Sequence, residues 1–272
     1  MAVPAKAFND AYLSREKVAR YFGVAPEIAH LVPELLVDFY DLGSFPERIV
    51  ELLRAQELEP GARVLDLGCG KGAVALSVAK QLRASVEGVD MMSTFIEEAK
   101  ERAERAGLAE SCRFTCGDIR QRLGNLNTWS EAFDVVLFLS VGEVLGNLAA
   151  SIKILRQVVR KGGYIVIDDG YIKEGVTVDF PGYEQSLDRQ QCLDQLTSFG
   201  DRIVVEEAIP LTAIREQNKR FMAWIENRAQ EIAARYPEHT AALASYLEKE
   251  RVEVHLLEND FECVTWLLER RD

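Results

Sequence analysis

The run VLDLGCGKG, residues 64–72, decides the fold. Apolar residues on both sides of Asp66 predict a short buried strand, and glycines at 68, 70 and 72 follow it directly. Glycine adopts positive φ without strain and has no Cβ atom, so a ligand can come close to the backbone of such a turn. The segment Ala73 to Leu82 predicts a helix that begins at the turn. In open α/β sheets, ligands bind beyond the carboxyl ends of the parallel strands, where such a turn lies.

Strands and helices alternate after this turn. The pattern predicts strands at 84–90, 112–116, 133–139 and 163–168, and helices at 93–106 and 148–160. Such alternation is typical of a parallel sheet covered by helices on both faces. The continuous apolar runs VVLFL and YIVI fit strands that are buried on both sides. The sequence therefore predicts the α/β class.

Helical additions flank the alternating region. Residues 1–60 predict an N-terminal helical cap segment, in which Pro26 and Pro46 each open an apolar-periodic stretch. Residues 61–272 form the main domain. Near its end, strands are expected at 203–209 and 261–268. The helical stretch between them, residues 211–258, is expected to be an insertion with one helix to about Tyr236 and a second from Pro237 toward Lys249.

Composition excludes several classes of protein. The formal charge is −12, with 44 acidic against 32 basic residues. This balance disfavours nucleic-acid binding, which usually needs a basic face. The five cysteines are odd in number and form no CxxC pair, so we expect neither a disulfide framework nor a metal site. No apolar run approaches the ~20 residues that cross a bilayer, and the N-terminus lacks the apolar core of a signal peptide. We expect a cytoplasmic protein with no membrane partner.

The glycine run and three later elements carry a family resemblance. The spacing is GxGxG, with Asp66 two residues before the first glycine, whereas the dinucleotide fingerprint is GxGxxG. Asp90 ends the second strand, a GDI element at 117–119 follows the third, and RKGGY at 160–164 leads into the fifth. In this order the elements resemble those of the class I S-adenosylmethionine (SAM)-dependent methyltransferases, over about residues 62–170.

The resemblance implies a fold and a set of cofactor contacts. The implied fold is a seven-stranded, mostly parallel Rossmann-like sandwich that closes with antiparallel sixth and seventh strands, with N-terminal helices and a helical insertion before the last strand. An acid at Asp90 can accept both ribose hydroxyls. The resemblance assigns Asp118 to the adenine amine, and Met91 or Met92 could line the adenine. The expected SAM-binding residues are Asp66, Gly68, Cys69, Gly70, Gly72, Asp90, Met91, Gly117, Asp118, Ile119 and Leu139.

Acceptor-side residues should follow the fourth and fifth strands. Glu143 is the best polar candidate after the fourth strand, as a base or as a carboxylate that holds a cationic substrate. Asp168 and Asp169 follow the fifth strand; because neighbouring strand residues face opposite ways, only one of them easily faces the cleft. We choose Glu143 and Asp168 as candidate catalytic residues, against the alternative that they are loop acids. The (N/D/S)PP(Y/F/W) motif of DNA-amine methyltransferases is absent here.

These observations favour methyl transfer from SAM to a small-molecule acceptor. The N-terminal segment and the 211–258 insertion both contain aromatic residues and are expected to cover the cleft. A protein side chain is the alternative acceptor, and a SAM-binding protein without catalysis is a second alternative. An NAD-linked oxidoreductase is a third, which the GxGxG spacing disfavours. The sequence does not indicate an oligomeric state.

Overall fold

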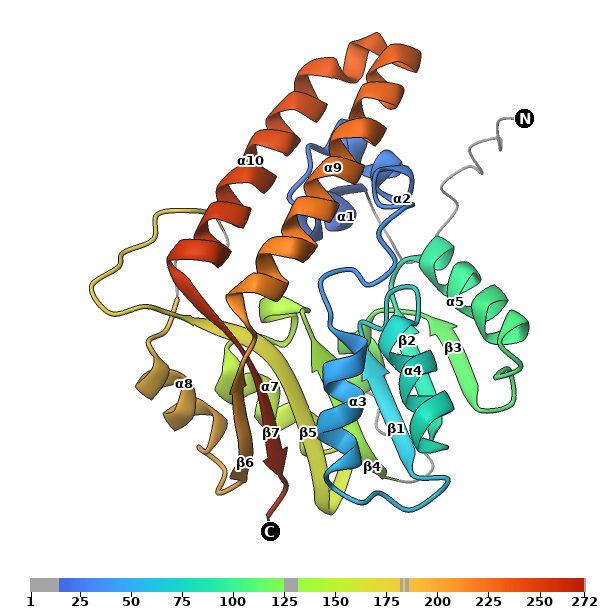
Figure 1. The fold of residues 1–272 in the computed structure, drawn as a ribbon, viewed down its shortest axis with the longest axis vertical. Helices are drawn as coiled ribbons and strands as arrows, with labels where there is room; N and C mark the ends of the chain where they lie inside the picture. The colour runs from blue at the N-terminus through green and yellow to red at the C-terminus, as the bar shows by residue number, and fades with distance from the viewer. Residues whose placement is uncertain (1–14, 125–131, 182, 184–185, 272) are drawn as a thin grey trace.

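The computed structural model describes residues 15–124, 132–181, 183 and 186–271. Seven strands form one sheet in the order β3-β2-β1-β4-β5-β7-β6, and β1 to β5 run parallel (Figure 1). This confirms the predicted seven-stranded, mostly parallel sheet. The strand bounds are Arg63–Leu67 (β1), Ser85–Asp90 (β2), Cys112–Cys116 (β3), Phe133–Leu139 (β4), Val159–Ile172 (β5), Arg202–Ala208 (β6) and Phe261–Glu269 (β7).

Helices cover both faces of the sheet. One apolar layer packs α3, α4 and α5 against it, and a second layer packs α6, α7 and α8 against the other face. The bounds of these helices are Pro46–Arg54 (α3), Ala73–Leu82 (α4), Ser93–Arg105 (α5), Ile119–Gly124 (α6), Leu148–Leu155 (α7) and Arg189–Leu196 (α8).

Three expected elements differ from the structure. The helix expected over 148–160 ends at Leu155, because Val159 is buried and pairs with Phe133, so β5 starts there and continues to Ile172. The second helix of the insertion extends beyond Lys249, since α10 runs from Thr240 to Asn259. Only β7 runs against the sheet, whereas β6 is antiparallel to β7 and therefore parallel to β5. The two helices of the insertion lead out from the carboxyl end of β6 and return the chain to the same edge of the sheet. Because β7 starts at that edge, it runs antiparallel to β5 and β6.

The N-terminal helices pack against the insertion, above the carboxyl ends of the parallel strands (Figure 1). The insertion consists of α9 (Leu211–Arg235), a short 3-10 helix η4 (Pro237–His239) and α10. The N-terminal part consists of α1 (Arg15–Tyr21), the 3-10 helix η1 (Pro26–Leu31) and α2 (Val32–Leu35). Their shared apolar cluster also includes Met92 and Phe95 from the start of α5. Ion pairs of Arg228 with Asp38 and of Arg235 with Glu34 join α9 to the N-terminal part.

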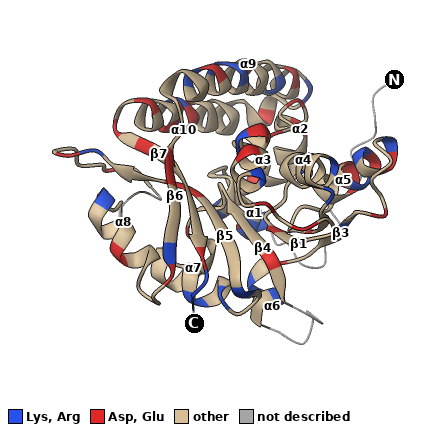
Figure 2. Ribbon diagram, turned by 60° about the horizontal axis from the view of Figure 1, so that its bottom comes forward, with Lys and Arg blue, Asp and Glu red and all other residues tan. Residues whose placement is uncertain are grey.

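Charge is mixed on the outer helices. Basic and acidic residues alternate along α5 and α9 (Figure 2), and many form ion pairs with one another. These two helices therefore do not present the continuous basic face typical of nucleic-acid binders. Within the residues that the structure describes, no helix is long and apolar enough to cross a membrane.

Asp66 supports the connection between β1 and α4. Its side chain is only 3% exposed, and its carboxyl group accepts a hydrogen bond from the Ala75 N–H in the first turn of α4. Burial raises the pKa of Asp66 to about 7, and the nearby Asp90 carboxylate adds to the rise. A carboxyl group in this position is therefore protonated over part of the neutral range, and the geometry of the turn depends on it.

We predict that Asp66→Asn changes how stability depends on pH. The folded wild type holds a proton on Asp66 up to about pH 7, whereas the unfolded chain loses it near pH 4. The free energy of unfolding of the wild type should therefore fall, relative to the variant, as the pH rises from about 4 to about 7, and the difference should stay constant above that range. Urea titrations at several pH values measure this difference. A difference that is independent of pH would contradict the assignment.

Candidate cofactor and acceptor site

The glycine turn after β1 is tightly packed. Gly68, Gly70 and Gly72 have φ values of 79°, 51° and 80°, in the left-handed region that favours glycine. A Cβ atom on Gly68 would lie 2.8 Å from Cγ2 of Val141, and one on Gly70 would lie 2.6 Å from Cδ1 of Leu42. Both the conformation and the space therefore require glycine, and Leu42 and Val141 border the turn.

Asp90 joins the end of β2 to this turn. Its carboxylate accepts hydrogen bonds from the Gly70 N–H at 2.9 Å and the Met92 N–H at 2.8 Å. Burial raises the pKa of Asp90, and these two hydrogen bonds oppose the rise. The Met91 N–H also acts on this carboxylate, and because a carboxylate has about four acceptor positions, acceptor capacity remains for a ligand hydroxyl. This position suits the ribose contact predicted from the sequence.

Backbone bonds complete this edge of the sheet. The N–H groups of Gly68 and Cys69 donate to the Val89 carbonyl, and the Gly117 N–H donates to the Asp90 carbonyl. The ends of β1, β2 and β3 thus form one hydrogen-bonded unit. Ile119 and Leu139 are buried beside it. The structure brings all the expected cofactor-binding residues to the carboxyl edge of β1 to β4.

Some of these residues have other partners as well. The Cys69 side chain is buried in the apolar layer between the sheet and helices α3 to α5, and its carbonyl accepts from the Gly72 N–H. Met92 is buried beneath the N-terminal helices, whereas Met91 is only half-buried. Asp118 accepts from the Arg120 N–H at the start of α6. Burial acts to raise the Asp118 pKa, but the hydrogen bonds and charge of Arg120 outweigh it, so the pKa is lowered and the carboxylate stays ionised.

The acceptor side pairs Glu143 with Asp169. Glu143 is exposed in the 3-10 helix η3 (Gly142–Leu145), and its charge acts on Asp169. Desolvation by nearby protein atoms raises the pKa of Asp169 to about 6, and the charge of Glu143 adds to the rise. The Asp169 residue is nevertheless exposed. Two carboxyl groups from different strand ends therefore share this edge.

Asp168 points to the other face of β5. Its side chain is 6% exposed and accepts a hydrogen bond from the Thr265 hydroxyl on β7. Burial raises its pKa to about 6, while the charge of Arg48 on α3 opposes the rise. The DD pair lies where β5 reaches the edge of the sheet, but strand alternation alone does not tell which aspartate faces Glu143.

The helix α10 adds acidic and hydroxyl groups near this edge. The Tyr183 hydroxyl donates to Oε1 of Glu253 at 2.7 Å, and the Tyr183 ring packs edge-on against Phe261. Burial raises the pKa of Glu250 to about 8, and Glu253 adds to the rise. Tyr183 also lies within electrostatic range of Asp169. The surroundings of Tyr183 are thus aromatic and contain the Glu253 carboxylate, whereas Glu250 is largely protonated at neutral pH.

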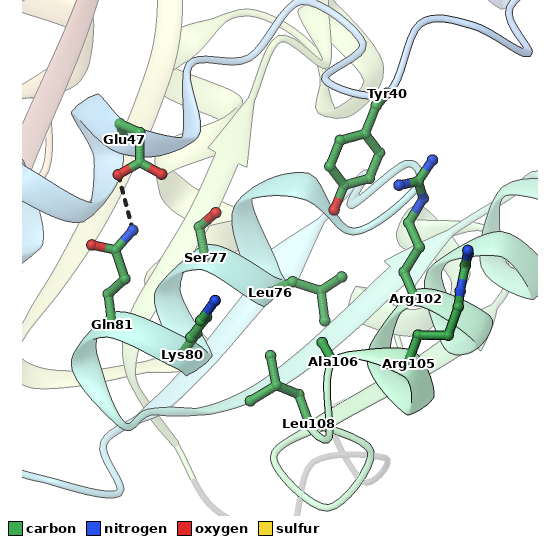
Figure 3. Close-up of a pocket in the computed structure, with 10 residues that line it drawn as sticks. All are labelled: Tyr40, Glu47, Leu76, Ser77, Lys80, Gln81, Arg102, Arg105, Ala106 and Leu108. Carbon is green, nitrogen blue, oxygen red and sulfur yellow. Dashed lines mark hydrogen bonds between the residues drawn. The ribbon is translucent and has the colours of Figure 1, made fainter.

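A separate hollow of about 530 Å³ lies on the outer side of α4 and α5 (Figure 3). It contains none of the expected cofactor-binding or catalytic residues. In Figure 3 the Tyr40 hydroxyl points into it, with Lys80, Arg102 and Arg105 around its rim. Arg102 is held by Glu98 and stacks on the Tyr40 ring. Elsewhere, the described residues include no group of three metal-ligating side chains.

Comparison with known proteins identifies relatives. Over 128 residues the chain is 30% identical to the uncharacterized protein YjhP of Escherichia coli K12, a match covering 47% of this chain and 50% of that protein. The chain is also 35% identical over 106 residues to a ubiquinone biosynthesis O-methyltransferase of Cereibacter sphaeroides. This match covers 39% of this chain and 40% of that protein. The matched stretches span about half or less of these relatives.

Solved structures share the fold over nearly the whole chain. The crystal structure of E. coli YjhP gives a TM-score of 0.73 at 20% identity, covering 89% of this chain and 98% of that one. The crystal structure of a SAM-dependent methyltransferase from Geobacter sulfurreducens, in complex with S-adenosylhomocysteine, gives a TM-score of 0.72 at 21% identity. The match covers 89% of this chain and 98% of that one.

A family model described as a methyltransferase domain matches residues 58–234. The match includes the glycine turn, Asp90, Asp118 and Glu143. Because it extends over more than half of the chain, the protein belongs to the class I SAM-dependent methyltransferases.

Proposed function

We propose that this methyltransferase acts on a small-molecule acceptor at the edge formed by Glu143 and Asp169. The observation that carries the proposal is the position of this carboxyl pair, exposed at the ends of β4 and β5, with the charge of Glu143 acting on Asp169. The N-terminal helices and the insertion pack together above the carboxyl ends of the parallel strands. The helical cover favours a small acceptor over a folded protein or a duplex. Two relatives support this class, since their names specify ubiquinone biosynthesis and a methylenesterol.

The donor side follows from the hydrogen-bonded unit at the ends of β1 to β3. Asp90 would accept the ribose hydroxyls through its free acceptor positions. Asp118 and Ile119 would border the adenine together with Met91 and Leu139. Gly68 and Gly70 would give the turn its left-handed backbone and let Val141 and Leu42 pack close against it. Asp66 and Cys69 would not contact the donor but would stabilise the conformation of the turn through their hydrogen bonds to Ala75 and Gly72. The Geobacter structure, which holds S-adenosylhomocysteine on the same fold, supports this placement.

The chemistry needs little from the protein besides position. SAM supplies a methyl group that a sulfonium already activates, and an acceptor lone pair displaces it in line. Asp169, with a pKa of about 6, is ionised at neutral pH and can take the proton of an acceptor that arrives protonated. Glu143 can hold the acceptor beside it. The negative charges of Glu143 and Asp169 disfavour an anionic acceptor.

Incubation with radiolabelled SAM and a metabolite extract tests the proposal. We expect label in the small-molecule fraction, and more of it in cationic or neutral compounds than in anionic ones. Label that appears only in proteins would favour a protein acceptor. SAM binding without any transfer would favour a SAM-binding protein that lacks catalysis.

We predict that Asp90→Ala weakens S-adenosylhomocysteine binding about ten- to a hundredfold. The loss of hydrogen bonds to a charged group costs ~1.5–3 kcal/mol, which gives this range. Isothermal titration calorimetry measures the affinity. The matched control is Asp134→Ala, because Asp134 also accepts a backbone N–H, from Arg63, but at the opposite end of the sheet. If both variants fold and bind with equal affinity, Asp90 does not contact the ribose.

We also predict that Glu143→Gln and Asp169→Asn keep the affinity for S-adenosylhomocysteine and lower kcat, because they act on the acceptor and not on the donor. The wild-type rate should rise with pH through about 6 as Asp169 ionises, and Asp169→Asn should remove this rise. Asp168→Asn is the matched comparison, since its side chain is bonded to Thr265 on the other face. A rate loss confined to Asp168→Asn would instead restore Asp168 as the catalytic residue.

A further inference from the structure

Lys71 is a buried lysine within the glycine turn. Its side chain is 2% exposed, and Nζ donates to the Leu36 carbonyl at 2.7 Å and the Val37 carbonyl at 3.0 Å. Oε2 of Glu98 lies 3.3 Å from the same nitrogen. An ammonium group has three N–H donors, and these three acceptors match them. The turn is therefore tied directly to the chain that follows α2.

That chain, residues 36–44, is here called the strap. The strap lies against the glycine turn and holds an unfavourable conformation there. Leu42 has a φ of 48°, and its Cδ1 atom occupies the space beside Gly70. Gly43 faces Ser140, a second non-glycine residue with positive φ, 53°. Such conformations persist only where surrounding contacts enforce them, and they concentrate at ligand sites.

The far side of the strap is fixed to α9. Asp38 pairs with Arg228 through two hydrogen bonds of 2.6 and 2.9 Å. The Phe39 ring packs against Phe221, with centroids 4.8 Å apart, and the Gln217 amide donates to the Ser44 carbonyl at 3.0 Å. The strap thus bridges the insertion and the glycine turn, and Lys71 makes its polar link to the turn.

We propose that Lys71 is a positioning residue that holds the strap against the glycine turn, so that Leu42 forms the outer wall of the SAM site. The proposal rests on SAM binding at this turn. Lys71 itself faces Leu36, Val37 and Glu98, so it acts on the donor through the strap. Loss of its ammonium group leaves the Leu36 carbonyl with only the Phe39 N–H as a donor and removes the bonds of Lys71 to Val37 and Glu98. The strap is then freed, and the bound cofactor dissociates faster.

The test compares Lys71→Met with Lys80→Met, which removes a lysine from the same region without touching the strap. We expect Lys71→Met to raise the Kd for S-adenosylhomocysteine about ten- to a hundredfold and to speed its dissociation in stopped-flow measurements. The KM for SAM should rise while kcat at saturating SAM stays near the wild-type value. Lys71→Arg should restore part of the affinity, and Lys80→Met should match the wild type.

Hydrogen exchange of residues 36–44 in the free protein provides a readout that needs no ligand. We expect faster exchange there in Lys71→Met and also in Arg228→Met, which loosens the strap from α9 if the first variant folds poorly. Unchanged exchange in the strap, or wild-type affinity and dissociation rate in a folded Lys71→Met protein, would overturn the proposal. If the wild type itself does not bind S-adenosylhomocysteine while Lys71→Met still frees the strap, the proposed SAM site fails and the link to the strap stands.

Discussion

The hydrogen bond from the Gly70 N–H to the Asp90 carboxylate is the interaction on which the rest of the site depends. It requires a left-handed glycine at 70, a half-buried acid at the end of β2 and parallel pairing of β1 with β2. The same carboxylate then offers its remaining acceptor positions at the sheet edge. Asp66 beneath it and Lys71 above it hold the turn from two sides, one through α4 and the other through the strap.

The helical additions give this common fold its particular site. The strap is fixed to α9 and brings Leu42 to the donor side, and Glu253 of α10 bonds to Tyr183, which lies within electrostatic range of Asp169. Lys71 links the glycine turn to the strap, and Arg228 links the strap to α9. Contacts far apart in the sequence therefore meet at the glycine turn. We infer that donor binding and the position of the cover are linked.

Much of the fold could be predicted from the sequence because strand and turn signals are local. The glycine spacing, the acid after β2 and the apolar runs each specify their own element. What failed depended on tertiary context: Val159 joins β5 because Phe133 pairs with it, and β7 alone is reversed because a helical pair precedes it. The sequence alone does not favour Asp169 over Asp168 and does not single out Lys71, since neither alternation nor the GxGxG pattern says which neighbour a side chain meets.

A crystal structure with S-adenosylhomocysteine tests the account most directly. We expect both ribose hydroxyls within hydrogen-bonding distance of the Asp90 carboxylate, Leu42 against the ligand, and the sulfur facing the edge that carries Glu143 and Asp169. A ligand bound elsewhere, such as in the hollow between α4 and α5, or a ribose that does not contact Asp90, would contradict the central claim.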